Sequence, residues 1–299
     1  MKRFLRWGGY AVLSLAAVLA VAYGAVYGYT EYRLGRKYDV PRMALALSAD
    51  SEVIAKGRHI ATVRGCVDCH GPELAGRLFI DGGPVGVLYA SNLTSGAGGV
   101  ADVYSDADLI AAIRHGVRPS GEPLWFMPSQ EFNVLSDEDV SALVSYIRSL
   151  EPVDNLLEPS TVGPLGRLLF AIGKLPLAPA ELIDHDAVRA PAPEAGATAE
   201  YGAYLATGCT GCHRSDFSGG KITGTPPDFP PASNITRDEE TGIGSWSEED
   251  FRRALTTGVR PDGSQLRPEM PWQLTAQMEE HELRALWLYL RSLPAVHTG

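Results

Sequence analysis

Two short frames of the sequence combine residue types that bind metals and redox cofactors. Cys66-Val-Asp-Cys69-His70 lies in the first half of the chain, and Cys209-Thr-Gly-Cys212-His213 lies in the second half. These are the only four cysteines among the 299 residues, so none remains for a separate structural disulfide. Two cysteines separated by two residues and followed by histidine suit a zinc site, a redox dithiol or the covalent attachment of a haem.

The context of the two frames favours haem attachment. A structural zinc site needs four closed ligands, and no second Cys or His pair is repeated beside either frame. A redox dithiol belongs to a strand–helix context, and a chance match explains one frame more readily than two. In c-type haem attachment both cysteines form thioethers, and the histidine lies beneath the iron. We therefore expect two covalently bound haem c groups, with thioethers at Cys66, Cys69, Cys209 and Cys212 and proximal ligands at His70 and His213.

A methionine follows each frame at the same distance along the chain. The interval from His70 to Met127 equals the interval from His213 to Met270, and both methionines precede proline. A six-coordinate haem needs a second axial ligand, and the thioether of methionine can bind haem iron. The sequence therefore predicts Met127 and Met270 as distal iron ligands, and Met278 as a core residue at the start of a helix.

Other polar residues are repeated in both halves and could contact the haem propionates. An arginine can hold a carboxylate with two hydrogen bonds. The alternative, on equal terms, is that these residues pin loops and helix caps. The equivalent pairs are Arg118 and Arg260, Tyr104 and Trp246, and Asn92 and Asn234.

The sequence around the frames is itself duplicated. ASNLT at positions 90–94 returns as ASNIT at 232–236, and GVRPSG at 116–121 returns as GVRPDG at 258–263, with the same offset in both cases. Such self-similarity indicates two homologous domains.

Each repeat is predicted to hold three helices. The first runs into the frame; the second opens with a serine capping box, at Ser105 or Ser247, and ends at a glycine. The third carries an apolar stripe at helical spacing. The predicted fold class is all-α, an N-terminal transmembrane helix followed by two tandem domains. The predicted boundaries are 1–32 for the membrane anchor, 45–155 for the first domain, 156–197 for the linker and 198–299 for the second domain.

The N-terminus predicts a membrane anchor. Lys2, Arg3 and Arg6 precede an uncharged run at residues 7–30, and about 20 apolar residues cross a bilayer. A cleaved signal peptide is the alternative, although its apolar core is usually shorter. The net charge of −10 argues against nucleic-acid binding, which needs a basic face.

With these motifs the chain resembles the class I cytochromes c in a two-haem, membrane-anchored form. More narrowly, it is similar to the cytochrome c subunits of periplasmic alcohol and gluconate dehydrogenases. The resemblance covers both repeats and rests on CVDCHG, CTGCHR, ASNLT, ASNIT, TGIGSWSEEDFRRAL, GVRPDG and the two Met-Pro pairs. The alcohol dehydrogenase subunits usually carry three haem domains, whereas this chain has two. In the first repeat SGAGGVADVYSDADL also replaces the GIGSWSEEDF form.

The resemblance implies an electron-transfer protein rather than an enzyme. Its partners would be redox proteins: a dehydrogenase or quinol-oxidising complex, a soluble cytochrome, an oxidase or a photosynthetic centre. Because haem is attached in this way outside the cytoplasm, we expect a single N-terminal pass through the bacterial inner membrane, with both haem domains in the periplasm. Two alternatives stay open, a dihaem subunit of a haem-copper oxidase and a dihaem peroxidase, which would need one iron with an open distal position.

Overall fold

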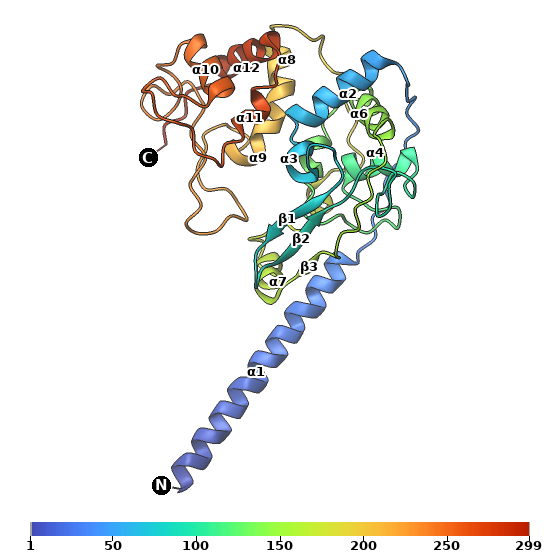
Figure 1. Cartoon of the computed structure of the whole chain (residues 1–299). Helices are drawn as coiled ribbons and strands as arrows, with labels where there is room; N and C mark the ends of the chain where they lie inside the picture. Colours follow the sequence, from blue (N-terminus) through green and yellow to red (C-terminus); the bar gives the residue numbers. More distant parts are fainter. Residues whose placement is uncertain (1, 299) are drawn as a thin grey trace.

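The computed structural model describes residues 2–298, which form a long N-terminal helix and a head of two domains (Figure 1). The helix α1 (Lys2–Leu34) has 33 residues and would be about 50 Å long at 1.5 Å per residue. It contains an 18-residue window with a mean hydropathy of 1.9, none of which is buried. By length and composition α1 can cross a membrane, a property that signal sequences share.

The first half of the head combines helices with a β-hairpin. Its elements are α2 (Ser51–Val63), α3 (Cys66–His70), β1 (Arg77–Asp81), β2 (Gly86–Ala90), α4 (Asp106–His115), α5 (Ser129–Phe132) and α6 (Asp137–Arg148). The predicted stripe on α6 is buried: Val140, Leu143, Val144 and Ile147 belong to one core with Ile60 of α2.

The second half repeats the helices and has an open loop where the hairpin would be. Its elements are α8 (Ala199–Ala206), η2 (Thr207–Cys209), α9 (Thr210–His213), α10 (Glu248–Thr257), α11 (Trp272–Thr275) and α12 (Glu280–Ser292). The stripe on α12 is buried as predicted, and Met278 packs against the same core, as the sequence also predicted. Both predicted capping boxes are present, at Ser105 and Ser247.

A glycine lets the first and third helices of each half cross closely. A Cβ on Gly57 of α2 would lie 2.0 Å from the carbonyl oxygen of Ala142 in α6. A Cβ on Gly202 of α8 would lie 1.9 Å from that of Ala285 in α12. Real Cβ atoms do not approach so closely, so both crossings require glycine. The shared contact supports the interpretation of the two halves as copies of one unit.

The all-α prediction is corrected by a small sheet. β1 and β2 pair antiparallel, and β3 (Thr161–Val162) from the predicted linker adds to β2, giving the order β1-β2-β3. The sequence pattern hid this hairpin because a bulge between Leu78 and Ile80 interrupts the strand periodicity. Gly86 makes the third strand possible, since a Cβ there would lie 2.3 Å from the carbonyl oxygen of Thr161.

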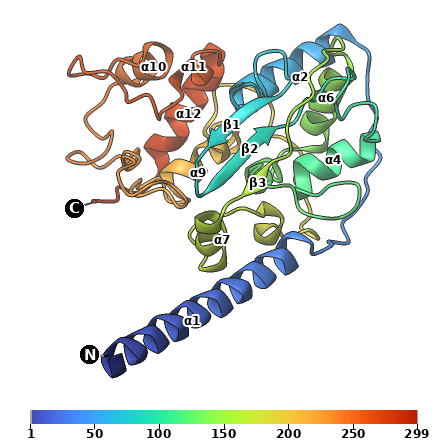
Figure 2. The same ribbon diagram turned by 60° about the horizontal axis from the view of Figure 1, so that its bottom comes forward.

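The predicted linker returns to the first half of the head before it reaches the second. After β3 it forms α7 (Pro164–Ala171) and the short 3-10 helix η1 (Pro179–Leu182). Phe170, Leu175 and Leu177 form a core with Leu34 at the end of α1. Both views show α7 beside the end of α1 that joins the head (Figures 1 and 2).

Candidate haem sites

Each Cys-x-x-Cys-His frame is wound into a short helical turn at the end of the first long helix. In the first half, Gly65 takes a left-handed conformation with φ 78° and separates α2 from α3. In the second half, α8 continues through η2 into α9 without such a break. A helical turn brings the first cysteine, the second cysteine and the histidine toward one side, because residues three and four apart share a helix face.

Both histidines predicted as proximal ligands are oriented by a backbone carbonyl. Nδ1 of His70 lies 2.7 Å from the carbonyl oxygen of Ser91, and Nδ1 of His213 lies 2.8 Å from that of Ser233. A hydrogen bond at Nδ1 fixes the ring and leaves Nε2 to bind a metal. Burial lowers the pKa of both imidazoles, so both are held in the neutral form that ligates metals.

The predicted ligands of the first site converge on one cavity. A cavity of about 560 Å³ is lined by Cys66, Cys69, His70 and Met127 together. Cofactor sites commonly have volumes of this order. The residues present therefore fit a covalently attached haem: two thiols at one edge, an imidazole on one side and a thioether sulfur from another element.

The protonation of the cysteines speaks against a redox dithiol. Burial raises the pKa of Cys66 to about 12 and those of Cys69 and Cys209 to about 11. Burial also raises the pKa of Cys212. Reactive dithiols need a lowered thiol pKa, because the thiolate is the nucleophile. Neutral thiols of this kind are better suited to permanent attachment than to exchange.

The two Met-Pro pairs have the same local geometry. Pro128 precedes α5 with φ −78° and ψ 56°, and Pro271 precedes α11 with φ −79° and ψ 60°. The carbonyl of each methionine accepts a hydrogen bond from the residue after the proline, at 2.7 Å for Met127 and 2.8 Å for Met270. The structure thus presents Met270 on the same backbone turn as Met127, which reaches the first cavity.

The first-half propionate candidates reach the cavity. Arg118, Tyr104 and Asn92 all line it. Burial raises the pKa of Tyr104, and the neighbouring Arg118 opposes that rise. A phenol and a guanidinium placed side by side are suitable donors for a carboxylate.

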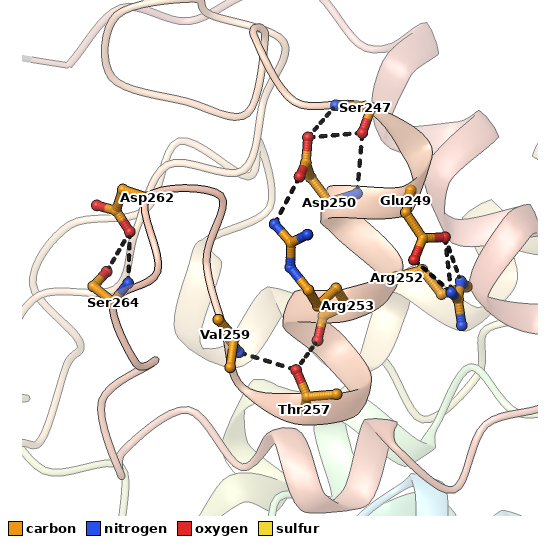
Figure 3. Close-up of polar contacts among 9 residues, drawn as sticks. All are labelled: Ser247, Glu249, Asp250, Arg252, Arg253, Thr257, Val259, Asp262 and Ser264. Atoms are coloured by element: carbon orange, nitrogen blue, oxygen red, sulfur yellow. Dashed lines mark hydrogen bonds and ion pairs between the residues drawn. The ribbon is translucent and has the colours of Figure 1, made fainter.

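In the second half, helix α10 and the loop that follows it, which carries Arg260, are held by their own hydrogen bonds (Figure 3). Ser247 and Asp250 close the capping box of α10, and the Asp262 carboxylate accepts hydrogen bonds from the backbone and hydroxyl of Ser264 at 2.9 and 2.7 Å. Within this loop the backbone N–H of Arg260 donates to the Ser264 carbonyl at 2.8 Å. Trp246 packs against the second core.

The asparagine pair has a structural role in both halves. The side-chain amide of Asn92 donates to the Val153 carbonyl at 2.7 Å, and its oxygen accepts from Thr94. Asn234 repeats this, with a donor distance of 2.6 Å to Val296 and acceptor bonds from Thr236. These contacts favour the loop-pinning interpretation for Asn92 and Asn234.

The two halves are joined by a pair of equivalent contacts. His59 on α2 binds Glu282 on α12, with Nε2 2.9 Å from the nearer carboxylate oxygen. Tyr204 on α8 donates its hydroxyl to Asp139 on α6. Tyr204 follows Gly202 at the same interval as His59 follows Gly57, so these two residues are equivalent. Asp139 and Glu282 are equivalent in the same way, because each precedes the alanine of its helix crossing at the same interval. The first helix of each half therefore contacts the third helix of the other half. The interface therefore has approximate two-fold symmetry in its polar contacts.

Two residues that the sequence did not single out lie between the sites. The guanidinium of Arg64, just before the first frame, donates to Tyr204, Leu205 and Thr207 of the other half at 3.0–3.2 Å. Glu131 lines the first cavity and reaches the second frame, where a Cβ on Gly211 would lie 2.2 Å from its carboxylate oxygen. Burial raises the pKa of Glu131 to about 7, and Arg64 opposes that rise. Only the adjacency of Arg64 to the first frame could have drawn attention to it.

Comparison with known protein families defines the class of this molecule. Residues 199–294 match the family model described as Cytochrome c. Residues 52–147 match the one described as Cytochrome C oxidase, cbb3-type, subunit III. The chain therefore contains two cytochrome c domains, which imply covalently bound haem c and a role in electron transport.

Curated relatives narrow the resemblance. The chain is 31% identical over 289 residues to the cytochrome c subunit of alcohol dehydrogenase (quinone) from Gluconacetobacter polyoxogenes, covering 85% of this chain and 58% of the relative. It is 30% identical to the gluconate 2-dehydrogenase cytochrome c subunit of Pantoea cypripedii, covering 83% and 61%. The fructose dehydrogenase cytochrome subunit of Gluconobacter japonicus is 29% identical, covering 83% and 54%. The chain thus spans little more than half the length of these relatives. Their names agree with the prediction of an electron-transfer protein rather than an enzyme.

Proposed function

We propose that this chain is a membrane-anchored dihaem cytochrome c of the bacterial periplasm. It passes single electrons between a dehydrogenase and a downstream acceptor. Haem c, when bound at both frames, supplies the one-electron couple. The chain's own residues hold each attachment point and orient the proximal imidazoles through the carbonyls of Ser91 and Ser233.

The observation that carries this proposal is the convergence of the ligand types in the first half, together with the repetition of its local geometry in the second half. Cys66, Cys69, His70 and Met127 line one cavity, and the second half repeats the frame, the histidine carbonyl contact and the Met-Pro turn. Histidine–methionine ligation raises a haem potential, which suits an acceptor of electrons from a dehydrogenase.

The contact between the halves supports electron passage from one site to the other. Glu131 borders the first cavity and the second frame at once. On the opposite side of the pseudo-symmetric interface, Leu274 of α11 lies 3.5 Å from where a Cβ on Gly65 would be. Each attachment turn is therefore pressed against the helix that follows the other site's methionine.

The membrane location is part of the proposal. α1 provides the single pass, with Lys2, Arg3 and Arg6 on the cytoplasmic side. Because Arg33, Arg36 and Lys37 follow the apolar run, charge alone does not orient the helix, and the side on which haem is attached decides. The head then lies on the periplasmic side, where haem attachment takes place.

The test is purification of the full chain from membranes in mild detergent, followed by haem staining, metal analysis and mass spectrometry of co-migrating proteins. We expect two haems per chain that survive denaturation, low-spin spectra for both, and a dehydrogenase subunit as the companion. One haem per chain would contradict the proposal. A stable high-spin haem that turns over peroxide would contradict it as well and would favour the peroxidase alternative.

A second candidate is a subunit of a haem-copper oxidase. The match of residues 52–147 to the cbb3-type subunit III model favours it. The same purification separates the candidates, because a copper-containing oxidase would co-migrate in place of a dehydrogenase. A protein that migrates alone with both haems would instead indicate a free carrier.

A further inference from the structure

One side of α7 carries an exposed apolar stripe. Leu165, Leu168 and Ile172 are 41%, 44% and 59% exposed. Their spacing of three and then four residues puts them on one face of the helix and its last turn. The opposite face is buried in the head through Gly166, Arg167 and Phe170. The stripe has no covering element among residues 2–298.

α7 is fixed rigidly to the upper end of α1. Arg167 donates to Thr30 at 2.9 Å, forms an ion pair with Glu31 at 2.6 Å and stacks over Tyr27 at 4.1 Å. In the reverse direction, Arg33 of α1 donates to the Phe170 carbonyl at 2.9 Å and lies 3.8 Å over its ring.

A second clamp comes from η1. The guanidinium of Arg33 also pairs with the carboxylate of Glu181. These contacts join α1, α7 and η1 into one rigid body. The position of α1 in the membrane therefore determines how far the stripe lies from the bilayer.

The position of this body along α1 matches the membrane surface. A span of about 20 apolar residues that begins at Trp7 ends near Val26. Exposed tyrosines, which favour the interface, occur at this end of the helix: Tyr23, Tyr27, Tyr29 and Tyr32. α7 contacts α1 from Tyr27 to Arg33, just beyond the apolar span. Both views place α7 alongside that end of the helix (Figures 1 and 2).

We propose that Leu165, Leu168 and Ile172 form a membrane foot that inserts into the headgroup–acyl boundary of the bilayer beside α1. This inference rests on the proposed anchor. Exposed apolar side chains also cover α1 before its contact with α7, and an amphipathic helix at the membrane surface buries its apolar face in the lipid boundary. Exposed Lys174 follows directly and can meet lipid phosphates.

The foot gives the first haem site a fixed position above the membrane. Leu88, Trp125 and Phe126 line the first cavity and also pack against the core beneath α7. A single layer of side chains thus links the foot to the cavity wall. The foot would hold the first site close to the bilayer and leave the second site farther from it.

The test uses single nitroxide labels on the full haem-loaded chain in phosphatidylcholine–phosphatidylglycerol nanodiscs. The four native cysteines are then held in thioethers, so unsubstituted protein takes up no label and serves as the blank. Labels are introduced by Leu168→Cys and Ile172→Cys, with Val12→Cys in α1 as the lipid reference. Leu288→Cys is the aqueous control, an apolar helix residue 36% exposed on α12 at the opposite end of the head (Figure 1).

We expect the labels at positions 168 and 172 to collide with oxygen and to lose collisions with a water-soluble nickel chelate, as the label at 12 does. The label at 288 should respond to both reagents. Labels at 168 and 172 that are as open to nickel as position 288, while position 12 remains in lipid, would overturn the foot and leave the anchor standing. A label at 12 open to nickel would overturn the anchor itself.

The same samples test whether another protein, and not lipid, covers the stripe. Labels at 168 that are shielded from both oxygen and nickel, or that broaden through contact with a second labelled chain, would show a protein partner and overturn the proposal. Leu168→Glu with Ile172→Glu provides an independent readout, with labels at Leu165→Cys. We expect that pair to restore nickel access at position 165 while both haems stay low-spin. Unchanged shielding would contradict a lipid-seated foot.

Discussion

The two cytochrome c domains share their framework and differ in what covers the site. Both cross their first and third helices at a glycine, cap the second helix with serine and present methionine on the same Pro turn. Over the first site lie the β1–β2 hairpin and the returning linker, residues 156–160 of which line the cavity. The corresponding stretch of the second domain, residues 221–231, is a mostly exposed loop. The positions that fix the ligands are duplicated, whereas the cover is particular to each domain.

This difference in cover has a redox consequence. A drier haem favours the reduced state, because burial disfavours the extra positive charge of the oxidised iron. We expect the first site to have the higher potential and the second site the lower one. A potentiometric titration should then show two separable midpoints.

The largest expected effect comes from the distal ligands. Met127→Leu and Met270→Leu should each leave haem attached and lower the potential of that site alone, by about 100 mV or more, since axial ligands set haem potentials over about 0.8 V. Redox titration followed in the visible spectrum measures both midpoints. Because each variant shifts one midpoint, the pair also assigns the higher potential to a domain.

Met278→Leu is the matched control for these variants. Met278 packs in the second core, so its replacement should leave both potentials in place. If Met278→Leu lowered a potential and Met270→Leu did not, the ligand assignment in the second domain would be wrong.

The next effect tests whether the two frameworks are equally demanding. Gly57→Ala and Gly202→Ala would each place a methyl group about 2 Å from a carbonyl oxygen of the facing helix. Forced overpacking of this kind costs about 1–3 kcal/mol, so each change should lower the thermal midpoint by several degrees. Thermal unfolding followed by circular dichroism in detergent gives the comparison.

Gly196→Ala is the control, because nothing lies within 4 Å of a Cβ at that position. Similar losses at positions 57 and 202 would mean that the domains depend equally on the crossing. No loss of stability at either position would contradict the close approach of the two helices at these glycines.

Much of the shared framework was predictable from the sequence. Helix caps and core stripes are local patterns, and their repetition at a nearly constant offset along the chain supplied an internal check. The carbonyls that orient the histidines were within reach as well. Ser91 and Ser233 precede the asparagines of the repeated ASNLT and ASNIT motifs, yet nothing local reveals that their carbonyls face the imidazoles.

The features that differ between the domains were the ones the sequence concealed. The hairpin is bulged, and its third strand comes from the distant segment that follows α6. The contacts of Arg64 and Glu131 join residues of different domains. Such pairings depend on how whole elements pack, and periodicity within one element carries no information about them.

A smaller effect concerns the pseudo-symmetric interface, whose two contacts should respond differently to pH. The hydrogen bond to Glu282 raises the pKa of His59. Burial acts to raise the pKa of Glu282, but the contacts with His59 and with the Glu279 backbone outweigh burial, so this pKa is lowered. A raised histidine pKa stabilises the fold fully below about pH 6.5 and loses this contribution as pH rises through the folded value. The lowered carboxyl pKa contributes above about pH 4.5, so the pair is strongest between these limits.

Tyr204 provides the matched comparison. Burial raises its pKa to about 12, so the Tyr204 hydroxyl stays protonated throughout the working range. His59→Gln should therefore lower the thermal midpoint more at pH 5.5 than at pH 8.5. Tyr204→Phe should cost about 1 kcal/mol at both. Equal losses for His59→Gln at the two pH values would show that the ion pair is not formed.

The smallest expected effect concerns a titratable difference between the two sites. Glu131 on α5 and Leu274 on α11 follow their methionines at the same interval, and each faces the other domain's frame. With the pKa of Glu131 raised to about 7 by burial, an electron that arrives nearby favours its protonated form. A midpoint potential should then fall as pH rises from 6 to 8, by less than the limit of about 59 mV per unit for one electron and one proton. Glu131→Gln should flatten this slope, and Leu274→Gln, which introduces polarity without a titrating group, should preserve it. If the slope persisted in Glu131→Gln, another group would be taking up the proton that is coupled to reduction, and Glu131 would not be the coupled residue.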